Sequence, residues 1–266
     1  MKISHFKILF TLLILGFTSC EQEYVKPVKI TYQQQAVDST LIPNTEMEDF
    51  IEPYTKKIDS EMKTVLTYAS KSMFKSDSNY NTALGNLIAD AVLEEANPLF
   101  KQKYNLNIDA VLLNYGGIRS GISKGEISVR TAYDIMPFEN EIIIVELPYE
   151  AVQEMIAYLI DRKTAHPISG MQIKLNHDYS LAKASINNEE INLKDAKKKS
   201  FYIATTDYLL QGGDQMEFFA KNNKVYSLNY KFRNLLIDYF TKKDEIDASQ
   251  DDRFTVGGNL QKAKSY

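Results

Sequence analysis

The stretch AVLLNYGGIR, residues 110–119, passes from an apolar run to two adjacent glycines and then to an arginine. The apolar run predicts a buried strand over 109–114. Gly116 and Gly117 lack side chains, so a flat or anionic ligand could approach the backbone closely where the strand ends. Arg119 offers a planar fork suited to bidentate phosphate contact. The alternative is that the glycines only form a turn and that Arg119 pairs with a surface acid.

Hydrophobic spacing on both sides of this stretch predicts the remaining elements. Helices are expected at 47–62, 84–97, 128–135, 149–161 and 229–240, with Pro98 ending the second. Extended segments are expected at 65–73, 109–114, 141–147, 171–175, 183–187 and 200–206. Because helices and strands interleave irregularly, the pattern favours an α+β fold with mixed β-sheets and packed helices over a doubly wound parallel sheet.

The first 19 residues are expected to be a signal peptide. Their apolar run, Ile8–Phe17, follows a basic start and is too short to span a bilayer as a helix. Cys20, the only cysteine, comes next, and this arrangement resembles a bacterial lipoprotein signal in which Cys20 becomes the lipid-bearing N-terminus. A buried free cysteine is the alternative. We therefore expect a lipid-anchored protein of the bacterial cell envelope, on the periplasmic or the surface face.

The rest of the chain divides into three expected parts: a tether at 20–46, a linker helix at 47–63 and a folded domain at 64–266. Removing residues 1–19 takes two lysines from the 31 basic residues and none of the 35 acidic ones. The remaining chain is acidic, whereas a nucleic-acid binder usually carries a basic face. Nucleic acid is therefore not an expected partner.

Four stretches stand out together: ALGNLIADA (83–91), LNYGGIRSGI (113–122), IMPFENEI (135–142) and TTDYLLQGGDQMEFF (205–219), with a weaker fifth, ISGMQI (168–173). In this order and spacing they resemble the C-terminal, substrate-binding domain of the 5′-nucleotidase family over roughly residues 64–220. The resemblance implies the fold of that domain and a nucleotide or nucleoside ligand.

The resemblance also assigns the family's ligand contacts. These positions are Asn114, Gly116, Gly117, Arg119, Phe138, Tyr208, Gly213 and Asp214. Phe138 and Tyr208 would clamp the nucleobase, Asp214 would accept hydrogen bonds from the ribose hydroxyls, and the arginine would reach the phosphate. Core packing is the alternative for both aromatic residues, and a hairpin turn with an exposed carboxylate is the alternative for Asp214.

One position departs from the family. Its members usually carry a further phosphate-binding arginine just before the LGNLIADA stretch, where this chain has only Lys71 and Lys75. A lysine supplies charge without the bidentate fork. The sequence leaves open which lysine, if either, replaces the arginine.

The family hydrolyses phosphate esters with a separate N-terminal domain that holds two metal ions on clustered Asp, His and Asn ligands. Such clusters do not occur in this sequence, and His166 and His177 are expected to be surface or hydrogen-bonded residues. We therefore expect no catalytic residue, metal site or cofactor in this chain. Two hypotheses remain: the chain supplies the substrate site to a separate metallophosphatase chain, which carries the divalent metals, or it is a membrane-tethered binding lipoprotein without catalytic activity.

Overall fold

The computed structural model describes residues 31–259 of the 266-residue chain, so the expected signal peptide and Cys20 lie outside the described residues. The chain falls into two units, Met1–Phe50 and Ile51–Tyr266, and the second contains every candidate site residue that is described. Among residues 31–259, no helix is both long enough and apolar enough to cross a membrane.

The helices lie close to the predicted positions. They are α2 (Thr45–Met62), α3 (Ala83–Tyr104), α4 (Val129–Ile135), α5 (Tyr149–Arg162), the short α6 (Asp207–Leu210) and α7 (Phe232–Thr241). The expectation that Pro98 ends α3 is wrong, because the helix continues for six residues beyond it. A proline costs the helix one backbone hydrogen bond, and the fully buried Phe100 in the next turn packs in the core and stabilises the continuation.

The strands form three sheets. They are β1 (Val65–Ala69), β2 (Ala110–Leu112), β3 (Gly125–Ser128), β4 (Glu141–Pro148), β5 (Ile168–Ser169), β6 (Met171–Leu175), β7 (Leu181–Ile186), β8 (Glu189–Glu190), β9 (Ser200–Thr206), β10 (Lys224–Lys231), β11 (Glu245–Ile246) and β12 (Phe254–Val256). The orders are β11-β1-β3, β10-β4-β9-β2-β5 and β12-β6-β7-β8, and each sheet mixes parallel and antiparallel pairs. The predicted helix at 229–240 begins only at Phe232, because β10 occupies the residues before it.

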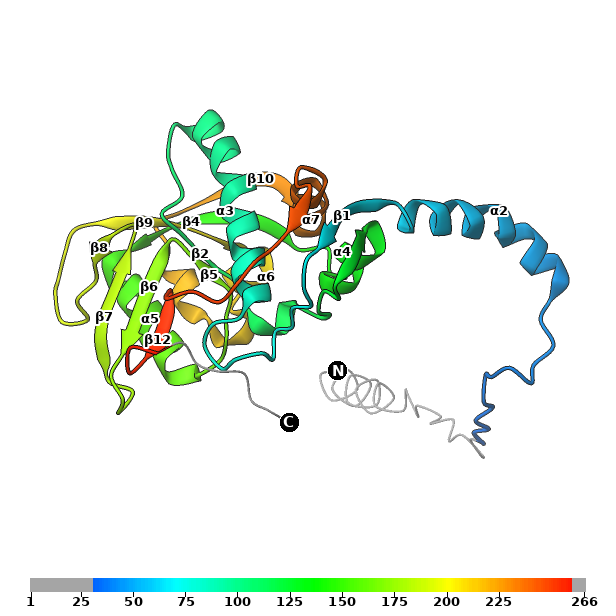
Figure 1. Cartoon of the computed structure of the whole chain (residues 1–266), viewed down its shortest axis with the longest axis horizontal. Coiled ribbons are helices and arrows are strands. Elements are labelled where there is room, and N and C mark those ends of the chain that lie inside the picture. Colours follow the sequence, from blue (N-terminus) through cyan, green and yellow to red (C-terminus); the bar gives the residue numbers. More distant parts are fainter. Residues whose placement is uncertain (1–30, 260–266) are drawn as a thin grey trace, which may run out of the picture. The chain divides into compact units, whose positions relative to one another are not determined.

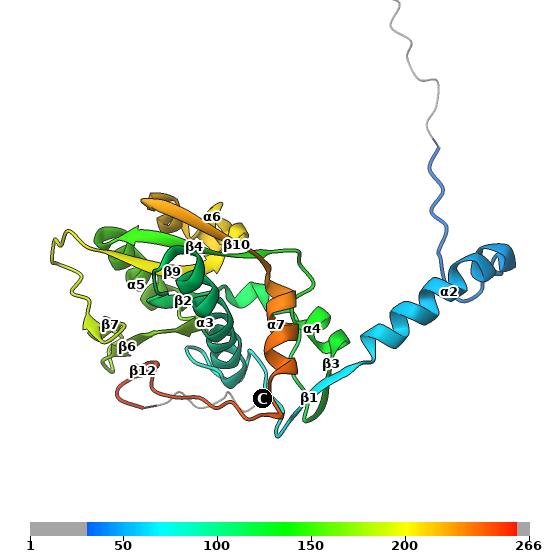
Figure 2. The same ribbon diagram turned by 90° about the horizontal axis from the view of Figure 1, so that it is seen from above.

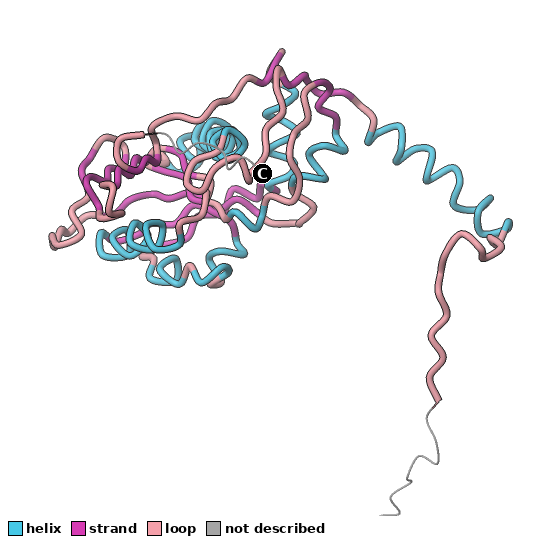
Figure 3. Tube along the Cα trace, turned by 60° about the horizontal axis from the view of Figure 1, so that its bottom comes forward, coloured by secondary structure: helices cyan, strands magenta, loops and turns pink. Residues whose placement is uncertain are grey.

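The five-stranded sheet is buried on both faces. Along β4, Ile142 and Ile144 belong to a core with α3 and α7, whereas Ile143 and Val145 belong to a second core with α5. This two-sided burial explains why β4 reads as a continuous apolar run rather than an alternating one. The helix α3 lies over one face of the strands (Figure 1), and α7 lies between α3 and α4 (Figure 2). Other helices lie on the opposite side of the strands (Figure 3).

The direction of the strands brings three chain segments to one edge of this sheet. β2 runs parallel to β9, so the two strands end at the same edge. β4 runs antiparallel to β9, with Ile142 opposite Thr206, so β4 begins where β9 ends. The segments after β2, before β4 and after β9 therefore lie together, and these segments carry three of the four stretches singled out in the sequence.

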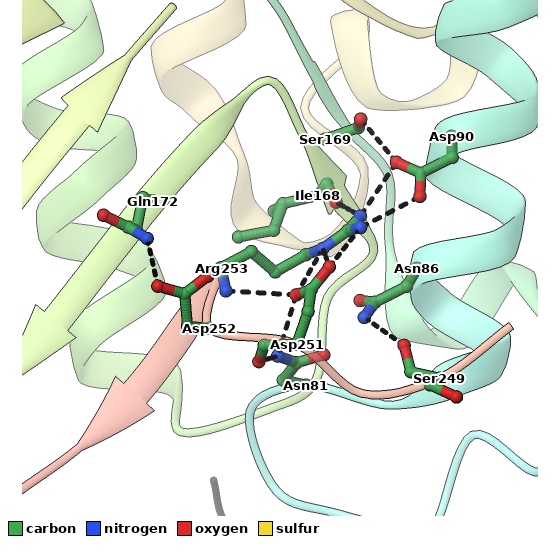
Figure 4. A network of polar contacts seen from close by, with 10 residues as sticks. All are labelled: Asn81, Asn86, Asp90, Ile168, Ser169, Gln172, Ser249, Asp251, Asp252 and Arg253. Atoms are coloured by element: carbon green, nitrogen blue, oxygen red, sulfur yellow. Dashed lines mark hydrogen bonds and ion pairs between the residues drawn. The ribbon is translucent and has the colours of Figure 1, made fainter. Parts of the chain in front are cut away.

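The C-terminal segment is held to the domain by a half-buried arginine (Figure 4). Arg253 donates to both carboxylate oxygens of Asp90 at 2.9 Å, to Asp251 at 2.6 Å and to the carbonyl of Ile168 at 2.7 Å. Asp90 lies on α3 and also accepts a hydrogen bond from Ser169. This network joins β12, the last strand in the described part of the chain, to α3 and β5.

Candidate functional site

A pocket of about 270 Å³ lies at this edge of the sheet. Its lining residues are Asn114, Gly116, Gly117, Arg119, Phe138, Asn140, Tyr208 and Asp214. The structure thus brings together seven of the eight ligand-contact positions expected from the sequence. The eighth, Gly213, does not line the pocket; a side chain there would meet the ring of Tyr208 at 2.3 Å, so this glycine makes room for the aromatic residue.

Two aromatic residues that are not part of the core line the pocket. Phe138 is 41% exposed and Tyr208 is 45% exposed, which does not fit the core-packing alternative. Asp207 connects their segments, because its Oδ1 accepts hydrogen bonds from the backbone N–H of Tyr208 at 2.9 Å and of Glu141 at 3.1 Å. The Asp207 carboxylate therefore joins the two segments: the start of β4, just after Phe138, and the turn that carries Tyr208.

The Asp214 carboxylate faces the pocket, held by two side chains. Its Oδ2 accepts from Nδ2 of Asn114 at 2.7 Å, and its Oδ1 accepts from the hydroxyl of Tyr208 at 3.4 Å. The residue has left-handed backbone angles, φ 53° and ψ 25°, and Gln215 after it also has a positive φ. A left-handed backbone conformation at a residue other than glycine costs about 1–3 kcal/mol of free energy and persists only where the surrounding contacts enforce it. Here the hydroxyl of Tyr158 donates to the Asp214 carbonyl at 2.8 Å.

The second glycine of the opening stretch makes room for Asn114. A Cβ at Gly117 would lie only 2.6 Å from Oδ1 of Asn114, whereas one at Gly116 would lie at an ordinary contact distance of 3.5 Å from Asn114 and Asp214. Gly117 therefore leaves space for the Asn114 amide that reaches Asp214, and both glycines line the pocket without a side chain.

One cation, Arg119, lines the pocket, and Lys75 contacts the turn that leads to it. Arg119 is exposed and donates to the carbonyl of Gly116 at 3.3 Å. It pairs with no acid in the described part of the chain, so the alternative that Arg119 pairs with a surface acid does not fit. Lys75 donates to the carbonyls of Ile118 at 2.6 Å and Tyr115 at 3.3 Å. Ile118 directly precedes Arg119, and burial, followed by the charge of Arg119, lowers the pKa of Lys75.

Lys71, the other candidate, points elsewhere. Its ammonium group contacts Asp247 and the hydroxyl of Ser249, both at 2.8 Å. Of the two lysines before the LGNLIADA stretch, Lys75 is therefore the one that contacts the turn leading to Arg119.

The sequence reasoning missed Asn140. Its side chain lines the pocket and makes no hydrogen bond within residues 31–259, so its amide is free to donate and accept there. Asn140 follows Phe138 by two residues in the IMPFENEI stretch. In extended chain such residues share a side, and this spacing could have pointed to Asn140.

His166 lies behind the site. It is buried, and its Nδ1 accepts a hydrogen bond from the backbone N–H of Tyr115 at 3.2 Å. Burial lowers the pKa of His166 to about 4, so the ring is neutral at neutral pH and acts as an acceptor. His177 is exposed. Within the described residues, no three His, Cys, Asp or Glu side chains are grouped so that they could hold a metal ion.

The described groups suit recognition of a ligand with three chemical parts. The exposed aromatic residues can stack on a flat ring, and the free amide of Asn140 can read the polar edge of that ring. The Asp214 carboxylate can accept hydrogen bonds from hydroxyl groups, and the cations of Arg119 and Lys75 can meet an anion.

Comparison with known proteins identifies relatives of this fold. The family model "5′-nucleotidase, C-terminal domain" matches residues 62–221. The chain is similar to an apyrase of Tabanus yao, with 22% identity over 79% of this chain and 40% of the apyrase. It is also similar to a 5′-nucleotidase of Vibrio parahaemolyticus, with 22% identity over 85% of this chain and 39% of that protein. The chain thus spans about two fifths of these relatives.

A solved structure bears out the fold. The 5′-nucleotidase precursor of Thermus thermophilus superimposes with a TM-score of 0.64 at 17% identity, over 80% of this chain and 43% of that one. The expected α+β fold with mixed sheets and packed helices is therefore confirmed.

Proposed function

From the premise that this chain belongs to the family of 5′-nucleotidase C-terminal domains, we propose that it binds a nucleoside or nucleoside monophosphate in the pocket at the sheet edge. The observation that carries the proposal is the position of the Asp214 carboxylate, which Asn114 and Tyr208 hold toward a pocket lined by two exposed aromatic residues.

The ligand's three parts match three regions of the pocket. The base would stack between Phe138 and Tyr208, worth about 1–3 kcal/mol per base, with the Asn140 amide at its polar edge. The ribose hydroxyls would donate to Asp214. The phosphate would meet Arg119, and Lys75 would supply a second positive charge where the family usually has an arginine.

A direct test uses equilibrium dialysis of the full-length protein, purified in detergent, with labelled adenosine. We expect unlabelled AMP to displace adenosine and ribose 5-phosphate to displace it poorly, because the sugar phosphate lacks the base that would stack. Displacement by ribose 5-phosphate as effective as that by AMP would contradict binding through the base.

We further propose that this chain supplies the substrate site for phosphate-ester hydrolysis carried out with a separate metallophosphatase chain. The proposal is supported by the family membership, by similarity to relatives named as 5′-nucleotidases, and by the lack of clustered metal ligands in this sequence. The alternative is a tethered binding lipoprotein. Adding a stand-alone metallophosphatase and Mn²⁺ should produce AMP hydrolysis that depends on Arg119 under the first proposal, and none under the alternative.

We also propose a lipid anchor at Cys20 that places the chain in the bacterial cell envelope. The support is the short apolar run that precedes this lone cysteine in the sequence. Expressed in bacteria with a labelled fatty acid, the wild type should carry the label and Cys20→Ala should lose it. Equal labelling of both proteins would contradict the anchor.

A further inference from the structure

Phe138 lies on a loop that forms one wall of the pocket, and this loop is not held in place by packing in the core. The loop Met136–Asn140 connects α4 to β4, and two of its residues, Phe138 and Asn140, line the pocket. Residues 137–139 are exposed. A stacking wall must keep its geometry before the ligand arrives, because ordering a loop on binding costs affinity. The loop therefore needs anchors from another part of the chain.

Three consecutive residues at the junction of β10 and α7 supply these anchors. The ammonium group of Lys231 donates to the Glu139 carbonyl at 2.9 Å. The backbone N–H of Phe232 donates to the Asn140 carbonyl at 2.9 Å, which extends the pairing of β10 with β4 by one step into the loop.

Arg233 makes the most extensive set of contacts. Its Nη1 lies 3.4 Å from the carbonyl oxygen of Met136 and 3.5 Å from that of Phe138, and its Nη2 pairs with the Glu139 carboxylate. The guanidinium also lies over the ring of Tyr133 in α4, with Cζ 4.0 Å from the ring centroid. One side chain thus contacts the loop at three residues and the helix that precedes it.

The burial of Arg233 makes this role more specific. The residue is 7% exposed, and its Nε is buried without a hydrogen-bond partner among the described residues. Burying a guanidinium with an unsatisfied N–H is unfavourable, and an apolar residue of similar size is often at least as stable in such a place. Stability of the fold alone therefore does not explain an arginine here. The arginine is explained by its planar fork, which reaches two carbonyls and a carboxylate at once.

We propose that Arg233, assisted by Lys231, is a positioning residue that fixes the Phe138 wall for stacking on the ligand. The role rests on the proposed nucleoside site. Residues 231–233 lie beyond the region 62–221 matched by the family model, so in this chain the segment that follows the matched region completes the site.

The first test follows backbone amide exchange in the ligand-free, full-length protein. Arg233→Met keeps the size and removes the fork, and the exposed Arg130→Met on α4 is the matched control. We expect the amide of Phe232, whose acceptor is in the loop, to exchange about tenfold faster in Arg233→Met and to be unchanged in the control. Equal exchange in wild type and Arg233→Met would overturn the anchoring.

The second test is a double-mutant cycle with adenosine binding as the readout. Arg233→Met should weaken binding by about fivefold or more, without exceeding the loss caused by Phe138→Ala, and should add nothing further in the Phe138→Ala background. Equal losses in both backgrounds, or no loss at all, would overturn this role alone. A wild type that binds no adenosine would overturn the proposed function and this role with it.

Discussion

The side-chain amide of Asn114 donates a hydrogen bond to Oδ2 of Asp214 at 2.7 Å, across a sequence separation of 100 residues. This contact joins the turn after β2 to the turn after β9, and each of these turns carries two adjacent glycines. Both turns end strands that run parallel in the central sheet, so the topology brings them to the same edge. The ligand site that we propose is built around this contact.

The Asp214 carboxylate should govern recognition of the sugar. Asp214→Ala removes the acceptor for the ribose hydroxyls and should weaken adenosine binding by about 1.5–3 kcal/mol, the usual contribution of hydrogen bonds to a charged group. The loss should be smaller for 2′-deoxyadenosine, which lacks one hydroxyl. Calorimetric titration with both ligands measures the difference. The control is Asp252→Ala, which removes an exposed carboxylate outside the pocket. If Asp214→Ala weakened the binding of both nucleosides equally, the carboxylate would not contact the 2′-hydroxyl.

Lys75 should matter for the phosphate and Lys71 should not. Lys75→Met removes the cation beside Arg119 and should weaken AMP binding by about 1 kcal/mol, with a smaller effect on adenosine. Lys71→Met breaks only the exposed contacts with Asp247 and Ser249, which lie outside the pocket, and should leave the binding of both ligands unaffected. The same titrations measure these effects. If Lys75→Met weakened adenosine as much as AMP, the lysine would act by holding the carbonyls of Tyr115 and Ile118 rather than by its charge.

His166 should make the fold sensitive to acid. Burial lowers its pKa from the ordinary 6.5 to about 4, so the folded state prefers the neutral ring. The unfolded chain therefore binds more protons between pH 6.5 and 4, and the stability contributed by His166 is present above 6.5 and is lost as pH falls through 4. Across this window the free energy of unfolding should fall by about 3 kcal/mol from this residue.

The measurement is urea unfolding at pH values between 4 and 7.5. His166→Asn keeps an acceptor for the Tyr115 N–H and cannot titrate. Its stability should therefore vary less with pH than that of the wild type. Identical pH profiles of the two proteins would show that another group controls the acid response.

Much of this site was predictable from the sequence because its residues lie in short stretches at strand ends. Asn114, Arg119 and Asp214 were identified in this way, and the spacing between Phe138 and Asn140 could have identified the latter. Arg233 has no such signal, since it acts on backbone carbonyls of a loop more than 90 residues earlier in the chain.

Other features depended on tertiary packing, which local patterns do not encode. The helix α3 continues past Pro98 because Phe100 packs in the core. The strand β10 has a single buried residue and a register shift between Ser227 and Tyr230. Its last residues, 229–231, could therefore be read as the start of the helix that follows.

Calorimetric titration of the full-length protein with adenosine tests the central claim most directly. We compare the wild type with Phe138→Ala, Tyr208→Ala and Leu209→Ala, the last a buried neighbour outside the pocket. The account predicts that the wild type binds, that loss of either pocket aromatic weakens binding by about 1–3 kcal/mol, and that Leu209→Ala lowers stability instead. Absence of wild-type binding at millimolar adenosine, or equal affinity of the wild type and both aromatic variants, would contradict it.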